Sequence, residues 1–252
     1  MFEITLQLFT LFVLAAFAAG FVDAIAGGGG LITTPVLLLS GMDPITALAT
    51  NKLQGSFGAA TAAYSYAQAG HVQLSSQIFA ASIAFATGAL GAFAVSFIPS
   101  ESLRRGLPVI LIAIALFFAF KRGLTDDDKV RRLSEPMFTA FFVPLIGAYD
   151  GLIGPGAGTF YMIGFVLLAG YGILKATAHT KLLNFSSNFG SLLVFAIYGA
   201  PMWKLGLVMG MAQIAGARVG SIVAMRVGSL VIKPLLVVTS TLLAGRLLWQ
   251  IL

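Results

Sequence analysis

Long apolar runs separated by short polar connections fill the chain. A helix needs about 20 apolar residues to cross the hydrocarbon core of a bilayer. About eight runs approach or reach that length, and they leave no room for a separate soluble domain. The pattern predicts an all-α, polytopic transmembrane helical bundle of about eight spans, with residues 1–252 forming a single membrane domain. The runs occupy residues 4–25, 45–67, 78–98, 107–120, 137–153, 173–197, 205–223 and 230–248.

Composition agrees with a lipid-facing surface. Hydrophobic residues make up 58% of the chain and charged residues only 10%, whereas about 25% of a soluble domain is charged. The formal net charge is +6, but the basic residues lie in short connections rather than in a cluster with interleaved aromatics. This distribution argues against nucleic acid as a partner and fits the excess of Lys and Arg in cytoplasmic loops. The absence of cysteine excludes a disulfide scaffold and a thiolate metal site.

The first half of the chain recurs in the second. Asp23 is matched by Asp150, 127 positions later, and the neighbouring glycines follow the same offset. After a two-residue insertion the offset becomes 129 and pairs Lys52 with Lys181. Glycines match easily by chance, but an Asp and a Lys in apolar surroundings do not. The chain is therefore interpreted as two internal repeats.

A polar linker joins the repeats. It covers 121–136, between repeat 1 at 1–120 and repeat 2 at 137–252, and the positive-inside rule predicts that it is cytoplasmic. Short apolar pieces at 31–40 and 158–169 would span about half a bilayer as helices. If such a piece completes a crossing, the repeats are inverted; if it only re-enters, they are parallel. The distribution of basic residues favours inversion.

Glycine runs interrupt the helical pattern at matching places, 27–30 and 154–158. Each glycine costs a helix about 1 kcal/mol relative to alanine. In lipid, freed backbone groups survive only where protein buries them or where they line a polar cavity. Broken helices in matching halves indicate a transporter's binding site, and their N-termini favour an anion. The predicted substrate-binding glycines are Gly27, Gly28, Gly29, Gly30, Gly154 and Gly156.

Other glycines suggest close helix packing. Gly20, Gly58, Gly88 and Gly91 stand singly within apolar runs. Small residues of this kind let helix backbones approach each other in membranes. We expect these four at helix–helix contacts rather than in a binding site.

Two lysines fall deep within the predicted spans. Asp43 and the proline after it are typical of a helix start, and Lys52 follows about 12 Å further along the axis. Lys181 takes the same place in the second half. A charge near the bilayer centre costs at least about 2.5–3.5 kcal/mol, so it is usually paired and functional. Asp23 and Asp150 are the natural counter-charges, either for a transport site or for purely structural ion pairs.

Polar residues accompany both lysines. His179 has an unperturbed pKa near neutrality and therefore joins Asp23 and Asp150 as a candidate for proton or ion coupling, the alternative being a histidine satisfied in the core. Residues 184 and 188 are four apart and share one face of their helix. The predicted substrate-binding side chains are Thr50, Asn51, Lys52, His179, Thr180, Lys181 and Asn184.

These motifs resemble the sulfite exporter TauE/SafE family. The resemblance rests on GFVDAIAGGGG at 20–30 and ATNKL at 49–53, then on GPG at 154–156 and HTK at 179–181, and it covers nearly the whole chain. It implies a secondary transporter of the inner membrane, in a family linked to sulfite, sulfoacetate, sulfolactate or toluenesulfonate. Pro155 and Ala157 replace glycines in the second half, which argues against a strictly symmetric site.

Three classes of function are compatible with the sequence. A proton- or sodium-coupled anion carrier explains the breaks, the deep lysines and the duplication together. A passive channel would need a continuous set of polar rings. A membrane-embedded enzyme or assembly factor is the third; HExxH, GxSxG and cysteine are all absent, so we expect no enzyme, cofactor or metal site. The expected partners are a small anion and the lipid bilayer, with a second copy of the chain in a homodimer as a further candidate.

Overall fold

The computed structural model describes residues 5–120, 127–128, 130–198, 201–228 and 230. Helices account for most of these residues, and the described part of the chain contains no strand, so the predicted all-α class is confirmed. In chain order the first half forms α1 (Leu6–Ala26), α2 (Gly30–Leu39), α3 (Pro44–Gln68), the 3-10 helix η1 (Leu74–Gln77), α4 (Ile78–Val95) and α5 (Ser100–Phe120). The second half forms α6 (Glu135–Met137), the π-helix η2 (Phe138–Phe142), α7 (Val143–Leu152), α8 (Ala157–Leu167), α9 (Ile173–Tyr198) and α10 (Trp203–Val227).

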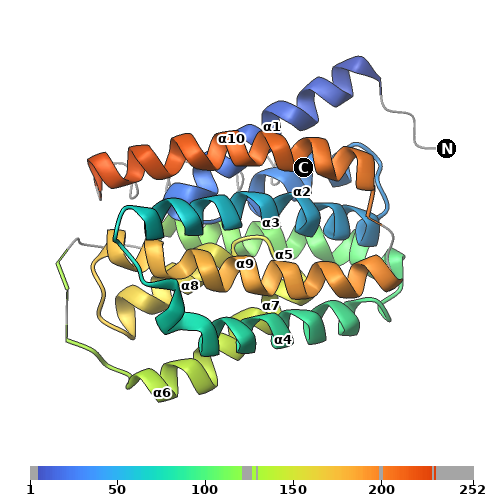
Figure 1. The fold of residues 1–252 in the computed structure, drawn as a ribbon. Helices are drawn as coiled ribbons and strands as arrows, with labels where there is room; N and C mark the ends of the chain where they lie inside the picture. The colour runs from blue at the N-terminus through green and yellow to red at the C-terminus, as the bar shows by residue number, and fades with distance from the viewer. Residues whose placement is uncertain (1–4, 121–126, 129, 199–200, 229, 231–252) are drawn as a thin grey trace.

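The two halves interlock in one bundle. The long helices α10, α3, α9 and α4 pack side by side in that order (Figure 1). Helix α1 packs on α10, and α7 packs on α4. Each half thus packs a long helix, α10 or α4, against a helix of the other half, α1 or α7. Neither half assembles the central helices without its partner.

Three helical segments among the described residues are long and apolar enough to cross a membrane: Leu6–Ala26, Leu74–Val95 and Trp203–Val227. Helices α3 and α9 are as long, at 25 and 26 residues, but they carry the polar stripes that include the two lysines. Helices α2 and α8 are shorter and apolar. Every predicted run within the described residues coincides with a helix, whereas the run at 230–248 and much of the linker lie outside them.

Two helices differ from their predicted forms. Helix α5 begins at Ser100 rather than at 107, because a polar first turn with Glu101 precedes its apolar part. The run predicted at 137–153 is not one uniform helix, since it passes through the π-helical segment before α7. Pro144, near the start of α7, has no amide hydrogen, so a regular helical bond pattern cannot run through it. The change from π-helical to α-helical hydrogen bonding lies next to that proline.

The packing role predicted for four glycines is confirmed. A methyl group built on Gly91 would lie 2.1 Å from a backbone oxygen of α7, and one on Gly88 2.4 Å from a backbone oxygen of α9. At Gly20 the methyl would lie 2.5 Å from a backbone oxygen of α10, and at Gly58 2.2 Å from the side chain of Gln213 on that helix. The three contacts with backbone oxygens are too short for any larger residue, whereas at Gly58 the flexible Gln213 side chain would have to move. Glycine therefore sets the spacing of α1 and α4 from their partners.

Candidate functional site

The two helix breaks touch each other inside the bundle. One break lies between α1 and α2, and the other between α7 and α8. A methyl group on Gly27 would lie 2.4 Å from the backbone nitrogen of Thr159, and the φ of Gly27 is 77°, a region that only glycine adopts readily. A methyl group on Gly30 would lie 3.2 Å from the Cα atom of Pro155. Backbone contact thus joins two segments from opposite halves of the chain.

Hydrogen bonds hold both breaks in place. The amide of Gly29 donates to Asp23 Oδ1 at 3.1 Å, so the Asp23 carboxylate closes the first break. In the second break the hydroxyl of Tyr149 donates to the carbonyl of Pro155. The hydroxyl of Thr159 donates across to the end of α1, to the carbonyl oxygen of residue 26, at 3.1 Å. The interrupted backbone is therefore fixed by protein groups that come from both halves.

Lys52 forms a buried ion pair with Asp150. Its Nζ atom lies 2.5 Å from Asp150 Oδ1, and the two side chains are 1% and 2% exposed. The hydroxyl of Ser187 donates to the other carboxylate oxygen at 2.5 Å. A methyl group on Gly154 would lie 2.6 Å from Lys52 Nζ, so glycine at this position makes room for the ammonium group. The pair links α3 of the first half to α7 of the second.

Lys181 is held differently. Its ammonium group is buried and donates to the backbone carbonyl of Asp23, not to the carboxylate. The Asp23 carboxylate receives the amide of Gly29 and, at 3.5 Å, the side-chain amide of Asn184. Within the described part of the chain, no carboxylate lies within ion-pairing distance of Lys181. Each lysine makes one hydrogen bond to a described residue and keeps further donors, but only Lys52 has a carboxylate partner.

A small polar cavity lies between the breaks. Its volume is about 30 Å³, room for about two water molecules. The N-termini of α2 and α8 both line it, which matches the rule that irregular backbone at membrane depth borders protein or a polar cavity. Its wall comprises Asp23, Gly28, Gly29, Gly30, Asn51, Gly55, Asp150, Gly154, Gly156, Ala157, Gly158, Asn184, Asn188 and Gln213.

Most of the predicted site residues meet at this cavity. Gly27 and the two lysines lie directly behind its wall, through their contacts with Thr159, Gly154 and the Asp23 carbonyl. Thr50 and Thr180 do not line it: Thr50 accepts a hydrogen bond from the amide of residue 202 at 3.0 Å, and Thr180 donates to a carbonyl of its own helix at 2.8 Å. Their role in binding stays a prediction. Among the described residues, no group of three or more His, Asp and Glu could hold a metal ion.

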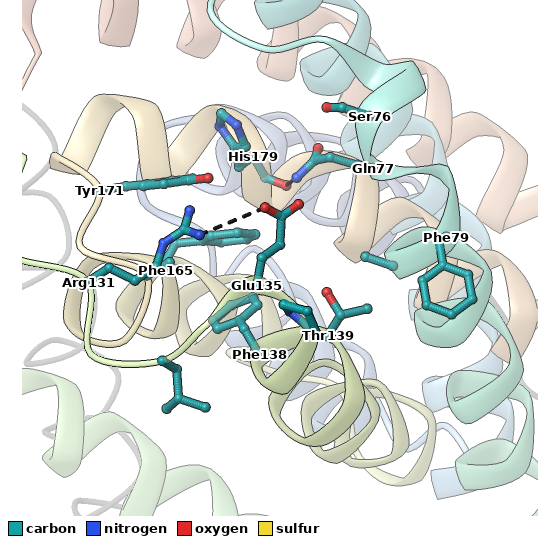
Figure 2. Close-up of a pocket in the computed structure, with 14 residues that line it drawn as sticks. Ser76, Gln77, Phe79, Arg131, Glu135, Phe138, Thr139, Phe165, Tyr171 and His179 are labelled. Atoms are coloured by element: carbon teal, nitrogen blue, oxygen red, sulfur yellow. Dashed lines mark hydrogen bonds and ion pairs between the residues drawn. The ribbon is translucent and has the colours of Figure 1, made fainter.

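His179 also lies away from the central cavity. Its Nδ1 atom is 2.8 Å from the carbonyl oxygen of Lys175, and its ring packs against Tyr171 and Phe165. It lines a separate cavity of about 380 Å³ between α4, α9 and the linker (Figure 2). Residues two apart on a helix do not face the same way, so His179 cannot share the direction of Lys181.

An amide network supports the first-half side of the cavity. Asn51 Oδ1 accepts from the hydroxyl of Thr33 at 2.6 Å and from Gln54 Nε2 at 2.9 Å. Gln54 in turn accepts from Gln213 Nε2 at 2.8 Å. With its oxygen occupied, Asn51 turns its NH₂ group toward the break, 3.2 Å from a methyl group built on Gly30. Gly55, Asn188 and Gln213 line the cavity in addition to the predicted site residues. The sequence places only Asn188, on the face of Asn184, although a Gln inside an apolar helix is the same kind of signal as the lysines.

The described end of the linker is tied to the turn between α8 and α9. Asp128 accepts from the amide of Gly172 at 2.6 Å and from Lys175 Nζ at 2.9 Å. These bonds, first that of the Gly172 amide, hold the pKa of Asp128 below its ordinary value. The amides of residues 132 and 133 both donate to the carbonyl of Leu168, at 2.9 and 3.0 Å. The larger cavity lies beside this attachment.

Comparison with known proteins gives consistent matches over almost the full chain. The family described as "Sulfite exporter TauE/SafE" matches residues 12–247. "Probable membrane transporter protein ORF9" of Sinorhizobium sp is 51% identical, covering 98% of this chain and 94% of its own length. "Probable membrane transporter protein YfcA" of Escherichia coli (strain K12) is 41% identical over 93% of this chain and 87% of its own. A "Probable membrane transporter protein" of Haemophilus influenzae is 38% identical over 98% and 97%. No solved structure matches the chain.

Proposed function

Because the chain belongs to the sulfite exporter TauE/SafE family, we propose that it is a secondary transporter that moves sulfite or an organosulfonate across the cell inner membrane, coupled to protons. Membrane transport itself is common to the family and to the named relatives. In this proposal the chain is multi-pass and the linker 121–136 faces the cytoplasm, as its basic residues favour. The packing of α1 on α10 and of α4 on α7 supports a division into two repeats.

The observation that carries the proposal is the meeting of two helix N-termini at one polar cavity. The amide end of a helix carries a partial positive charge and unpaired donors, which favour an anion. Here α2 and α8 both begin at the cavity wall. The free donors of Lys181 and the amide group of Asn184 lie beside them. Discontinuous helices that meet in this way bind anionic groups in other secondary transporters.

Asp23 is the group we assign to proton coupling. Asp150 is already neutralised by Lys52 and bonded by Ser187, whereas the Asp23 carboxylate forms no ion pair with any described residue. An anion beside an ionised Asp23 would be repelled, and a proton on Asp23 removes that charge. The anion would then accept hydrogen bonds from Lys181 and Asn184. Solute and proton therefore occupy the cavity together.

The size of the cavity favours a carrier over the channel alternative. A channel requires a continuous path of polar groups through the protein. The cavity at the breaks is about 30 Å³, and both helix N-termini converge at this one level. In the proposed cycle the halves must move relative to each other to admit a larger solute. The interlocked packing of α10, α3, α9 and α4 provides surfaces on which they could slide.

Flux into proteoliposomes tests the proposed function. Purified protein is reconstituted, and uptake of sulfite and of methanesulfonate is measured under a pH gradient or a sodium gradient, with empty liposomes as the control. Methanesulfonate stays ionised near neutral pH, so its flux does not arise from diffusion of a neutral acid. We expect uptake of at least one of these anions to follow the pH gradient. Uptake that follows sodium alone would contradict proton coupling, and no uptake of any small anion above the control would contradict anion transport.

A further inference from the structure

A groove lies between α3 and α10, two helices that pack side by side (Figure 1). Its volume is about 210 Å³, and it shares no lining residue with the central cavity or the linker-side cavity. Most of its lining residues are exposed, so the groove faces the surroundings of the bundle. They are Ser65, Gln68 and Ala69 of α3 and Arg218, Ile222 and Met225 of α10.

Arg218 brings a charge without a counter-charge to this groove. Its Nη1 atom donates to Ser65 Oγ at 3.3 Å, and the Ser65 hydroxyl donates to the carbonyl of Thr61 at 2.8 Å. None of the four ion pairs among the described residues includes Arg218. A guanidinium group has five donors, so most of those of Arg218 remain for a ligand.

The guanidinium group lies at the level where the hydrocarbon core of a bilayer ends. Gly55 lines the central cavity, and Ser65 follows ten residues later on α3, about 15 Å along the axis. Half of the hydrocarbon core measures about 15 Å, and transporters of this kind bind their solute near the midplane. Arg218 itself is only five residues beyond Gln213, which also lines the cavity, so its side chain extends toward the helix end to reach Ser65.

This end of the bundle is the linker side. Gln77, in the 3-10 helix that follows α3, lines the larger cavity together with Arg131 of the linker. A second exposed cation, Arg226, lies eight residues after Arg218, on the same face of α10. No acidic residue of the described chain lines the groove, so nothing there binds the ammonium group of a zwitterionic lipid. Basic pockets between membrane helices on the cytoplasmic side are typical sites for anionic lipid headgroups.

The equivalent place in the other half is apolar and filled. The offset of 129 assigns an apolar or aromatic residue to five of the six lining positions: Ala89 to Arg218, Val194 to Ser65, Ile197 to Gln68, Tyr198 to Ala69 and Phe93 to Ile222. The rings of Phe93 and Tyr198 contact each other there, with centroids 5.8 Å apart. The polar groove is therefore specific to α3 and α10 and is not a consequence of the repeated fold.

We propose that this groove binds the headgroup of an anionic phospholipid in the leaflet on the linker side. The lipid phosphate accepts hydrogen bonds from the free donors of Arg218, whose planar fork matches a phosphate group. An acyl chain lies along Ile214 and Met211, the exposed residues that precede Arg218 on the same face of α10. Charge and groove together select an anionic lipid over a zwitterionic one.

Native mass spectrometry of the purified full-length protein tests the site. Phosphatidylglycerol and phosphatidylcholine with the same acyl chains are titrated separately, and the affinity of the first bound lipid is measured. We expect the wild type to bind phosphatidylglycerol about tenfold more tightly, the effect of one charge-assisted contact. Inorganic phosphate in excess should not displace the lipid, because it lacks the acyl chains. Its displacement of the lipid would assign the groove to a free anion and overturn the proposal.

Matched variants separate this site from the general charge of the protein. Arg218→Gln should abolish the preference, and Arg218→Lys, which keeps the charge, should retain part of it. Arg105→Gln is the control: it removes the same charge from an exposed arginine that Glu101 already pairs, and it should keep the preference. Ile222→Phe copies the residue at the equivalent place of the other half and leaves Arg218 intact. It should weaken phosphatidylglycerol binding by filling the groove.

Three results would overturn the proposal. They are equal affinities in the wild type, a preference that survives Arg218→Gln, and a preference that Arg105→Gln removes equally. A wild-type dimer that Arg218→Gln separates, without any lipid preference, would assign the groove to a second copy of the chain instead. The measurement involves no transport, so failure of anion uptake leaves the lipid site standing, and loss of the lipid site leaves the proposed function standing.

Discussion

Lys52 and Asp150, 98 residues apart in the chain, form an ion pair that is almost completely buried between the two halves of the bundle. The related pair in the other half is incomplete, because Lys181 bonds the backbone of Asp23 and leaves the carboxylate aside. Lys52 and Asp150 thus form a complete ion pair, whereas Lys181 and the Asp23 carboxylate do not bond each other. This asymmetry separates a structural contact from a group that can respond to solute and proton.

Removing Lys52 should destabilise the protein strongly. Lys52→Met leaves the Asp150 carboxylate buried without its cation, which costs about 3–5 kcal/mol. Asp150→Asn in the same chain should restore much of that loss, because no charge then remains unpaired. Thermal unfolding of the wild type, both single variants and the double variant measures the coupling. If the two single effects simply add, the ion pair is not the source of the stability.

Lys181→Met should act on transport more than on stability. Only one hydrogen bond, to a backbone carbonyl, is lost among the described residues, at about 1.5–3 kcal/mol for a charged donor. The anion, however, loses its main cationic partner in the proposed site. We expect folded protein in detergent, seen as a single peak in size-exclusion chromatography, with uptake reduced at least tenfold. Uptake at the wild-type rate would remove Lys181 from the solute site.

The contact between the breaks can be tested with two glycines that both have a positive φ. Gly27→Ala places a methyl group 2.4 Å from the backbone of Thr159 and also strains a positive φ, so it should cost about 2–5 kcal/mol. Gly41 has a φ of 87° and nothing within 4 Å of an added methyl group. Gly41→Ala should therefore show only the backbone strain, about 1–2 kcal/mol. Equal losses of thermal stability in the two variants would argue against close contact of the breaks.

The linker contact predicts a pH dependence. The folded-state pKa of Asp128 is lowered, so its contribution to stability is present above its unfolded pKa of about 4 and is lost as the pH falls below that value. Asp128 is largely exposed, and the effect should be small. We expect Asp128→Asn to lower the melting temperature by about 1–2 °C at pH 7 and to make no difference at pH 3. A difference that persists or grows at pH 3 would contradict this assignment.

Local features of the sequence predict much of this architecture. Helix positions follow from long apolar runs, and the two breaks follow from glycines that no membrane helix tolerates in series. The meeting of the breaks at one cavity follows from tertiary packing, which depends on distant contacts such as Gly27 against Thr159. Single-residue patterns also do not reveal that each lysine reaches the break region of the opposite half.

Other differences between the sequence-based predictions and the structure have simple geometric causes. The position of His179 away from the central cavity follows from the 100° turn per residue, and a helical projection of the second half would have predicted it. The larger cavity could not be predicted, because it arises where the linker, the π-helical segment and α4 come together. Gln77 and Arg131 are ordinary polar residues near helix ends when read from the sequence alone.

In the proposed transport cycle, the solute passes through the cavity between the two helix breaks. Gly55 lines that cavity, and a side chain there meets only Asn188, at an ordinary contact distance of 3.6 Å. The chain has no cysteine, so Gly55→Cys creates a unique thiol. Gly106→Cys, with open space around it, provides the control.

The most direct measurement is the rate at which N-ethylmaleimide labels each variant in proteoliposomes, with and without an organosulfonate that the wild type transports. Sulfite itself adds to maleimides and is left out. We predict that the anion slows labelling of Gly55→Cys several-fold and leaves that of Gly106→Cys unchanged. If the anion does not change the labelling rate of Gly55→Cys, in a variant that still transports it, the solute does not pass through this cavity.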